Sequence, residues 1–382
     1  MGIYFIHDAN EENFFRGGIL RWKDIYSSIF SKAYPRKKIV TLTVDRISKT
    51  NFYKGDIVIS FALLEYFKVK KISTHVRSNG GKFGLCFGDS AQYIFDIYQQ
   101  FIPLIDFCIV QELGESNLYE NLYGKPAFDH PVFQLTDHSI VFKKIINKKI
   151  IDRKKLFVHL GRVEKARKNR VEGIKALQES GLEYVLYGPD PDLSEFIEPT
   201  KIYSKLSNCI YGLTMGAASN STSLSKKNIF DKYQFKGKIW DYMSCGCIPI
   251  IDYAPNLYMF GLKEGFHYLS VSSFNSHEYK RLNLINDEEK QEISNNAYNF
   301  CREKLSIENF KASFDIFENN LLKSKYSANL DLYKFKPNQL KRASFQYTIL
   351  RKKFTYEIFV SGFYFIKILN YVFNKISSIG RS

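Results

Sequence analysis

Cysteine is scarce in this sequence and is never arranged as in metal sites or disulfide frameworks. The 382 residues include six cysteines and seven histidines, with no CxxC pair and no cluster of histidines. This pattern argues against a structural zinc site and against a fold held together by disulfides. Most cysteines lie within apolar runs, which indicates the reduced, buried thiols of a cytosolic protein: Cys86, Cys108, Cys209, Cys245, Cys247 and Cys301.

Long apolar runs are missing as well. The chain begins MGIYFIHDAN, with no basic segment before the apolar residues and with Asp8 close behind them. We therefore expect a strand there and no signal peptide. In the last part of the chain the longest uncharged apolar stretch, Ile358 to Ile366, has nine residues and is too short to span a bilayer.

Acidic residues are outnumbered by basic ones, and the formal charge is +16. From 331 to 382 there are ten basic and two acidic residues, a net +8, so half of the excess lies there. The basic groups alternate with aromatic ones, which favours a helix lying in the interface of an anionic membrane. Two alternatives stay open, a helix packed on the protein or a dimer partner, and a nucleic-acid-binding segment, although no RNA or DNA module accompanies the charge.

What the sequence does contain is a repeated alternation of short apolar runs and helical patterns. The runs GIYFI, KIVTLTV and DIVISF are followed, after a linker-like stretch at 143–155, by KLFVHLG, EYVLYG and NCIYGLTM, and a long helical pattern covers 287–323. Such alternation predicts βαβ units and parallel sheets. We predict an α/β fold with two Rossmann-like doubly wound domains facing across a cleft, 1–148 and 149–325, and a basic amphipathic tail over 326–382.

The end of KLFVHL carries groups suited to a phosphate. In doubly wound domains, ligands bind beyond the carboxyl ends of the strands, where helices begin. Here Gly161 and Arg162 follow the strand, and Lys165 and Lys168 come soon after. Backbone N–H groups, Arg162 and one of the lysines could together hold a diphosphate. The alternative for each cation is a solvated helix face.

Two further segments point to the same edge. The run EYVLYG ends at Gly188 and is followed by Pro189, so a second turn opens toward the same edge. The alternative is an ordinary tight turn with no ligand. In KGKIWDYMSCGCIPII, Lys238, Asp241 and Tyr242 share one face of a short helix. The carboxylate could accept ribose hydroxyls, and the lysine could meet a phosphate. The alternative is an exposed ion pair between Lys238 and Asp241.

KIWDYMSCGCIPII resembles the pattern Lys-x-x-Glu-Tyr-Met-Ala-x-Gly-x-Pro-Val-Ile in the C-terminal domain of GT-B glycosyltransferases of the group 1 type. The resemblance implies that Asp241 binds the ribose of a nucleotide-sugar donor. FVHLGRVEKARKNRVEGIKAL is similar to the family's strand-Gly-Arg-turn-Lys-helix segment for the donor diphosphate, and YVLYGPD to its Gly-x-Gly-Pro strand end. We expect Gly246 to end the helix tightly beside the cleft.

Two positions depart from that family. Tyr233 stands where many retaining members have the first glutamate of Glu-x7-Glu, and Asp241 is shorter than the second. A divergent, CgeB-like or capsule-type branch therefore stays open beside the standard retaining subgroup.

The resemblance to GT-B enzymes implies that the first domain binds the acceptor, and an inverting reaction would need a general base there. Candidates at strand ends are His7, Asp8 and Asp89, each of which could equally be a capping or surface residue. Gly17 and Gly18 resemble the glycine turn after the first strand of GT-B enzymes and could approach the donor.

Together these features predict a glycosyltransferase that moves a sugar from a nucleotide-sugar donor to a lipid-linked or surface-polysaccharide acceptor. It would act at the cytoplasmic membrane face, with 331–382 on the anionic lipid. We expect no cofactor, no metal, since no DxD motif is suitably placed, and no nucleic-acid partner. The alternative is a catalytically inactive GT-B-like scaffold subunit of a polysaccharide assembly complex.

Overall fold

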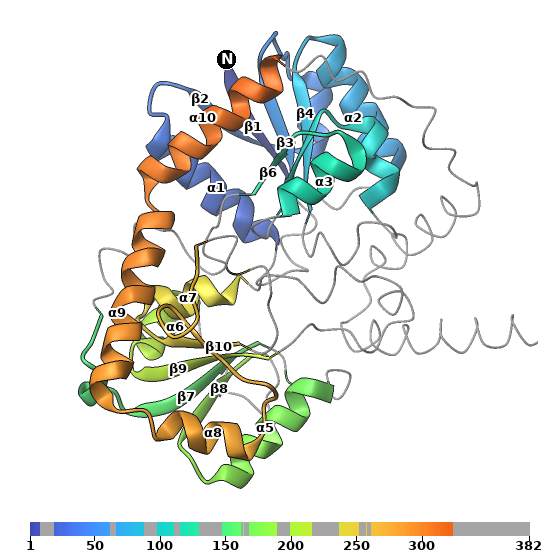
Figure 1. The fold of residues 1–382 in the computed structure, drawn as a ribbon. Coiled ribbons are helices and arrows are strands. Elements are labelled where there is room, and N and C mark those ends of the chain that lie inside the picture. The colour runs from blue at the N-terminus through green and yellow to red at the C-terminus, as the bar shows by residue number, and fades with distance from the viewer. Residues whose placement is uncertain are drawn as a thin grey trace, which may run out of the picture.

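The computed structural model describes twelve parts of the chain: 1–7, 19–61, 66–87, 98–110, 115–129, 147–161, 163, 168–188, 199–215, 237–251, 257 and 261–323. These parts form two parallel sheets, each covered by helices, so the predicted α/β class with two doubly wound sheets is confirmed (Figure 1). None of the described helices is both long enough and apolar enough to cross a membrane.

The first sheet has six strands in the order β2-β1-β3-β4-β5-β6. All neighbouring strands pair in parallel. The strands are β1 (Gly2–His7), β2 (Lys38–Thr43), β3 (Ile57–Ser60), β4 (Lys82–Phe87), β5 (Phe107–Val110) and β6 (Ala127–Phe128). The elements between them are α1 (Ile19–Ala33), η2 (Val44–Lys49), α2 (Tyr66–Ser78), η4 (Gln99–Leu104) and α3 (Glu115–Tyr123).

The second sheet has five strands in the order β11-β10-β9-β7-β8, again all parallel. They are β7 (Lys155–Leu160), β8 (Tyr184–Tyr187), β9 (Cys209–Thr214), β10 (Ile248–Ile251) and β11 (Leu269–Ser270). The remaining elements are η5 (Ile150–Asp152), α5 (Lys168–Ser180), α6 (Pro199–Leu206), α7 (Lys238–Ser244), α8 (Ser276–Asn283), α9 (Asp287–Lys304) and α10 (Ile307–Lys323).

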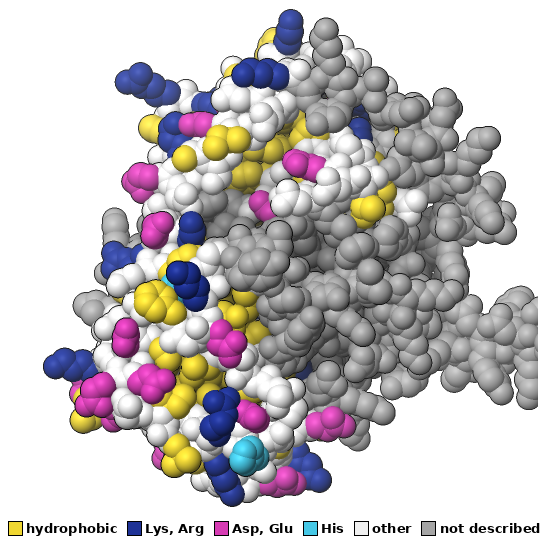
Figure 2. Space-filling model, viewed as in Figure 1, with side chains coloured by type: hydrophobic (Ala, Val, Ile, Leu, Met, Phe, Trp, Pro, Cys, Tyr) yellow, Lys and Arg dark blue, Asp and Glu magenta, His cyan; other side chains and the backbone are white. Residues whose placement is uncertain are grey.

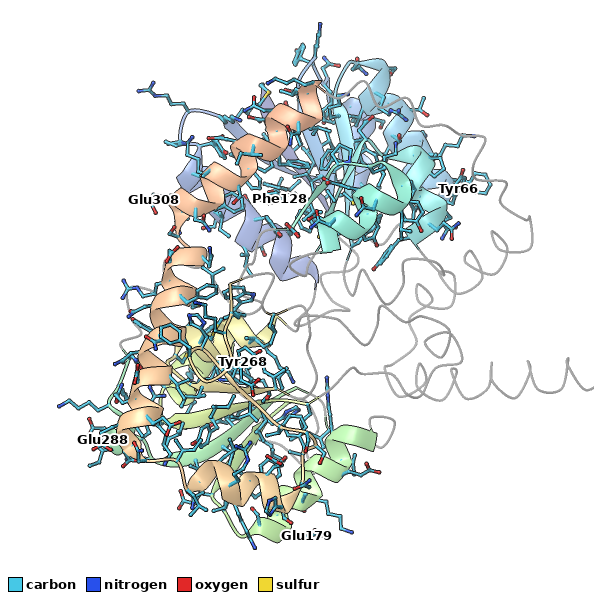
Figure 3. The ribbon with its side chains drawn as sticks, in the orientation of Figure 1. Tyr66, Phe128, Glu179, Tyr268, Glu288 and Glu308 are labelled. Carbon is cyan, nitrogen blue, oxygen red and sulfur yellow. The ribbon has the colours of Figure 1, made fainter. Side chains whose placement is uncertain are left out.

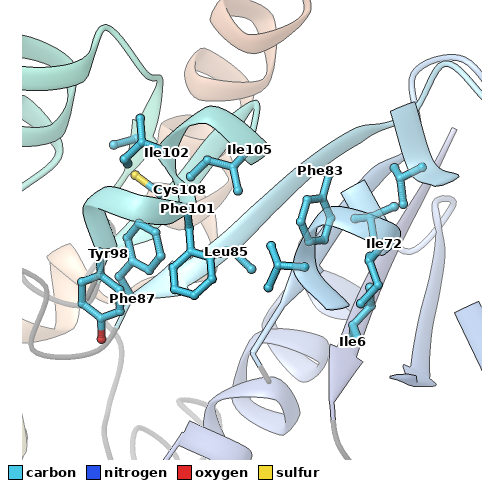
Figure 4. Packing of buried hydrophobic residues seen from close by; sticks show 14 of the residues in the cluster. Ile6, Ile72, Phe83, Leu85, Phe87, Tyr98, Phe101, Ile102, Ile105 and Cys108 are labelled. Carbon is cyan, nitrogen blue, oxygen red and sulfur yellow. The ribbon is translucent and has the colours of Figure 1, made fainter. Parts of the chain in front are cut away.

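Strand alternation gives the first sheet two apolar faces. Val58 and Phe83 point to a cluster that is closed by η2, α2, η4 and α3, part of which is seen in Figure 4. Ile57 and Ile59 point the opposite way, to a cluster closed by α1 and α10. Because both faces are buried, the strands are almost continuously apolar, as parallel sheets require.

The long helical pattern at 287–323 forms two helices, not one. The break lies at Leu305 and Ser306, where Ser306 Oγ accepts a hydrogen bond from the backbone N–H of Asn309 at 3.1 Å and so caps α10. The side chain of Asn309 in turn donates to the carbonyl of Lys304 at 2.8 Å. The sequence pattern missed this break because the apolar spacing continues through it.

The break lets α10 return to the first domain while α9 stays with the second (Figure 1). The ring of Phe314 packs edge-on against Phe30 of α1, with centroids 4.6 Å apart, and against Phe128 of β6 at 5.3 Å. An ion pair joins Lys37 to Glu318 at 2.7 Å. Residues 307–323 fall inside the predicted second domain, yet their side chains complete the core of the first.

Candidate functional site

The polar groups of the second domain meet at the carboxyl end of β7. Gly161, directly after the strand, has φ +111°, a conformation that disfavours any residue with a side chain. Its N–H donates to the carbonyl of Tyr187 at the end of β8, at 2.8 Å. The turn after β7 is therefore fixed against the neighbouring strand, as a ligand-binding turn should be.

Two buried cations lie at this turn. Lys238, the first residue of α7, is 8% exposed, and its Nζ donates to the carbonyl of Leu160 at 3.2 Å. Arg170, in the first turn of α5, is also 8% exposed. A Cβ built on Gly161 would lie 3.7 Å from its guanidinium. Because buried cations stabilise an anion strongly in a low-dielectric site, this turn is suited to a phosphate.

Tyr242 joins the ends of two strands beside these cations. Its hydroxyl accepts from the N–H of Leu160 at 2.9 Å and donates to the carbonyl of Leu213 at 3.1 Å. The ring lies on the backbone of β9, where a Cβ on Gly212 would approach it to 2.3 Å. Burial raises the pKa of Tyr242 well above its usual value, so the hydroxyl keeps its proton. Tyr242 thus positions the ends of β7 and β9.

Asp241 faces α6. Its Oδ1 accepts from the hydroxyl of Tyr203 at 2.6 Å, and the carboxylate is 1% exposed. The exposed ion pair offered as an alternative for Lys238 and Asp241 is wrong, because both side chains are buried. All seven residues of α7 are buried, so the helix has no solvent face.

A hydroxyl that sequence reasoning missed lies at the end of β9. Thr214 is 3% exposed, and its Oγ1 has no hydrogen-bond partner. It points to the same face of the sheet as Gly212, on which Tyr242 of α7 packs. Because a buried hydroxyl without a partner is unfavourable, this group is suited to a ligand. The available signal was its position just before the hydroxyl-rich loop GAASNSTSLSKKN.

Several predicted site residues lie outside the described part of the chain. Gly188 is described and follows β8 at the same edge, and Lys168 begins α5, but its side chain is not described. The others cannot be placed: Asp8, Gly17, Gly18, Asp89, Arg162, Lys165 and Pro189. Arg170, which is described, lies at this turn. The roles predicted for Arg162, Lys165 and Lys168 stay predictions.

Gly246 lies at the opposite edge of the sheet, so the prediction that it borders the cleft is wrong. α7 runs antiparallel to the strands, from the carbonyl of Leu160 at one edge to the start of β10 at the other. Gly246 has φ +69°, and a Cβ there would lie 1.9 Å from Oδ1 of Asn147. Arg153 fills this corner and donates to the carbonyl of Cys209 at 2.6 Å. The glycine therefore makes room for the interdomain segment.

The described cysteines agree with the expectation of buried thiols. All six are free and buried, and burial raises the pKa of Cys247 to about 12. Across the described ranges, no group of three or more His, Cys, Asp or Glu side chains is placed to hold a metal ion.

On the first domain, His7 ends β1 and is 7% exposed. Its Nδ1 lies 3.3 Å from Nζ of Lys23. Since an ammonium only donates, Nδ1 accepts, and the lone pair that a general base needs is engaged. His7 as a base stays a prediction that requires this contact to open.

No protein family profile and no curated protein matches the sequence. Among solved structures, Anabaena Alr3699/HepE in complex with UDP-glucose is similar with a TM-score of 0.51 and 11% identity, over 83% of this chain and 99% of that one. The pneumococcal O-GlcNAc transferase GtfA aligns with a TM-score of 0.45 and 13% identity, over 74% of this chain and 60% of GtfA. Two facing parallel α/β sheets, the return of α10 to the first sheet and the likeness to HepE show that this chain has the GT-B fold.

Proposed function

We propose that this protein is a glycosyltransferase that uses a nucleotide-sugar donor. The observation that carries the proposal is the pair of buried cations, Lys238 and Arg170, at the Leu160–Gly161 turn of a GT-B fold. When a glycosidic bond forms, the departing nucleoside diphosphate gains negative charge. Preorganised cations at that position lower the barrier because they need no reorganisation during the reaction.

The neighbouring groups have distinct roles in this proposal. Thr214 would donate a hydrogen bond to a donor oxygen, and Tyr242 would hold the turn in register. A carboxylate offers about four acceptor positions, so Asp241 could bind a ribose hydroxyl in addition to the hydroxyl of Tyr203. Arg162 and Lys165 or Lys168 would add charge to the diphosphate site.

The acceptor is proposed to be a glycan or a lipid-linked sugar bound by the first domain. The charge of 331–382 supports a place on the inner face of the cell membrane, because cations alternating with aromatic groups favour an anionic lipid interface. The reaction would then take place in the cytoplasm, with the protein bound peripherally and without a metal.

Nucleotide binding tests the donor site directly. UDP is the first candidate because HepE has been solved with UDP and UDP-glucose. Calorimetric titration with UDP, GDP, CMP and dTDP should identify one nucleotide that binds. Lys238→Met should weaken that binding at least about tenfold, as expected for a lost charged hydrogen bond.

Lys290 provides the matched control. It is a lysine of the same domain, 6% exposed, and it pairs with Asp287 at 3.2 Å. Lys290→Met should leave nucleotide affinity unchanged. Equal losses in both variants, or no binding by the wild type, would refute the donor site. Binding without hydrolysis or transfer of any nucleotide-sugar would instead support the inactive scaffold subunit.

A further inference from the structure

One side of the first domain exposes cations and aromatic rings together. η2, the segment after it and α2 carry six exposed basic residues: Arg46, Lys49, Lys54, Lys70, Lys71 and Arg77. Two aromatic side chains are exposed beside them, Phe67 at 77% and Tyr53 at 65%. We call this surface the basic face. Among the described residues of this face, Asp45 is exposed and acidic.

The basic face is one continuous surface because its elements pack on each other. η2, α2 and η4 cover the same face of the first sheet. Nε2 of His75 in α2 lies 3.1 Å from the carbonyl of Thr50, and the ring of His75 packs edge-on against Phe52. At the end of α2, Gly80 lies against the backbone of Lys54, where an added Cβ would approach Cα to 3.2 Å.

α2 has an unusual outward side. Its inward residues Val69, Ile72 and Val76 are buried in the core, and the helix contains no acidic residue. At helical spacing, Phe67, Lys70 and Lys71 point outward together. Arg77 also points outward, and it pairs with Asp106 at 3.4 Å. The free charge of this side therefore comes from the two lysines beside an exposed phenyl ring.

We propose that the basic face docks on an anionic lipid surface. Lysines on an outward helix side attract lipid phosphates, and an adjacent phenyl ring can enter the apolar boundary beneath the headgroups. α2 could lie along the surface without rearrangement because its apolar side is already buried in the protein. Nucleic acid is the less suitable partner, since no RNA or DNA module signature accompanies the charge in the sequence.

The basic face is formed by residues of the first domain, and none of them belongs to the segment at 331–382. Figure 3 shows Tyr66, at the start of α2, on the opposite side of the first domain from Glu308 of α10. On the visible face of the second domain, basic and acidic side chains are intermixed (Figure 2). The basic face would hold the first sheet, and the acceptor site proposed on it, near the membrane. The inference itself does not require glycosyl transfer.

Vesicle binding by the full chain tests the proposal. We would measure co-sedimentation with vesicles of phosphatidylglycerol and phosphatidylcholine, and with phosphatidylcholine alone. The triple variant Phe67→Ser, Lys70→Glu and Lys71→Glu should lose at least about tenfold in affinity for the anionic vesicles, since each cation contributes roughly fivefold. The wild type should bind the neutral vesicles far more weakly.

The second domain offers a matched control with the same changes in charge and apolar area. Lys175→Glu, Lys280→Glu and Leu284→Ser alter two exposed lysines and one apolar residue that is 83% exposed. This variant should bind anionic vesicles like the wild type. Both variants should melt like the wild type by circular dichroism and bind nucleotide equally, which separates this test from that of the donor site.

Two outcomes would overturn the proposal. In one, the triple variant binds anionic vesicles as well as the wild type does, which would leave the tail as the source of any binding. In the other, single-stranded DNA competes fully with vesicles and Phe67→Ser alone has no effect, which would identify nucleic acid as the partner. An equal loss in the control variant would likewise remove the assignment to this face.

Discussion

The two sheets have the same parallel architecture but complete their cores differently. The first sheet needs phenyl rings from α10, about 180 residues after its last strand in the sequence. The second is completed mainly by neighbours in sequence, including the fully buried helix α7. The core of the first domain is therefore completed by a segment far away in the sequence, whereas the core of the second is completed by its own helices.

The two sheets also differ in the polar groups that lie at the carboxyl ends of their strands. In the first domain, the described edge groups include the contact between His7 and Lys23 and the hydroxyl of Ser60, which has no partner. In the second, Lys238, Arg170 and Tyr242 meet on one turn. Concentration of charge on one of two similar edges is what separates a donor domain from an acceptor domain in the proposed function.

The largest expected effect comes from weakening the packing of α10 on the core of the first domain. Phe314→Ala removes a buried ring packed on Phe30 and Phe128 and should lower the free energy of unfolding by about 3–5 kcal/mol. Urea denaturation followed by circular dichroism would measure it. Ile316→Ala, on the same helix but 65% exposed, should change it by less than about 0.5 kcal/mol. Equal effects would mean that α10 does not close this core.

The next prediction tests whether Tyr242 positions the donor site or only stabilises the second domain. Tyr242→Phe removes a buried hydroxyl that joins β7 to β9, and should lower stability by about 1–3 kcal/mol and weaken nucleotide binding. Tyr211→Phe removes a hydroxyl that donates to Leu282 on the other face of the sheet, at 2.8 Å. It should lower stability similarly and leave nucleotide affinity unchanged. Calorimetry would contradict the positioning role if both variants lost affinity alike.

A smaller effect compares the two unpartnered hydroxyls. Thr214→Val and Ser60→Ala each remove a buried hydroxyl without a partner, and each should raise stability by about 1 kcal/mol. Only Thr214→Val should also weaken nucleotide binding, by about fivefold, because that hydroxyl lies at the donor edge. Thermal denaturation with and without nucleotide would show both effects. Unchanged nucleotide affinity in Thr214→Val would remove this residue from the site.

The smallest expected effect is a dependence of the stability of the second domain on pH. His267 packs on Phe300, which stacks on Trp240 of α7, and burial lowers the pKa of its ring below the usual value of about 6.5, with a contribution from Lys263. The unfolded chain therefore takes up this proton at higher pH than the folded one. The stabilisation is present above pH 6.5 and is lost as pH falls through that value toward the folded-state pKa.

Replacing His267 tests this dependence. His267→Gln should show a flatter melting temperature between about pH 6.5 and 5 than the wild type. His277→Gln, at an exposed position of α8, should melt with the wild-type dependence. A wild-type slope in His267→Gln would show that this histidine does not titrate as its burial implies.

The periodicity of the sequence predicted the fold well. Strand ends such as those at His7, Leu160 and Thr214 lie within a residue or two of the ends of the apolar runs, because a buried parallel strand must be apolar throughout. The break at Leu305 and Ser306 was not visible, since apolar spacing continues across it. The return of α10 to the first domain was hidden for the same reason.

The candidate site was predicted only in outline. The segment at Lys238 was recognised from its pattern, but its residues do not reveal that the helix is buried on every side. Arg170 and Thr214 were not singled out, because nothing local distinguishes a buried cation or hydroxyl from an exposed one. Gly246 was assigned to the wrong edge, although the antiparallel course of a crossover helix makes its position a geometric necessity.

By itself, the sequence determined the two parallel sheets, the buried thiols and the residue types available at each strand end, because periodicity and turn chemistry act locally. Only the tertiary structure decided which cations meet at the Leu160–Gly161 turn, which hydroxyl lacks a partner and which core α10 completes. Those outcomes depend on packing between segments far apart in the chain, and local sequence patterns do not show which distant segments meet.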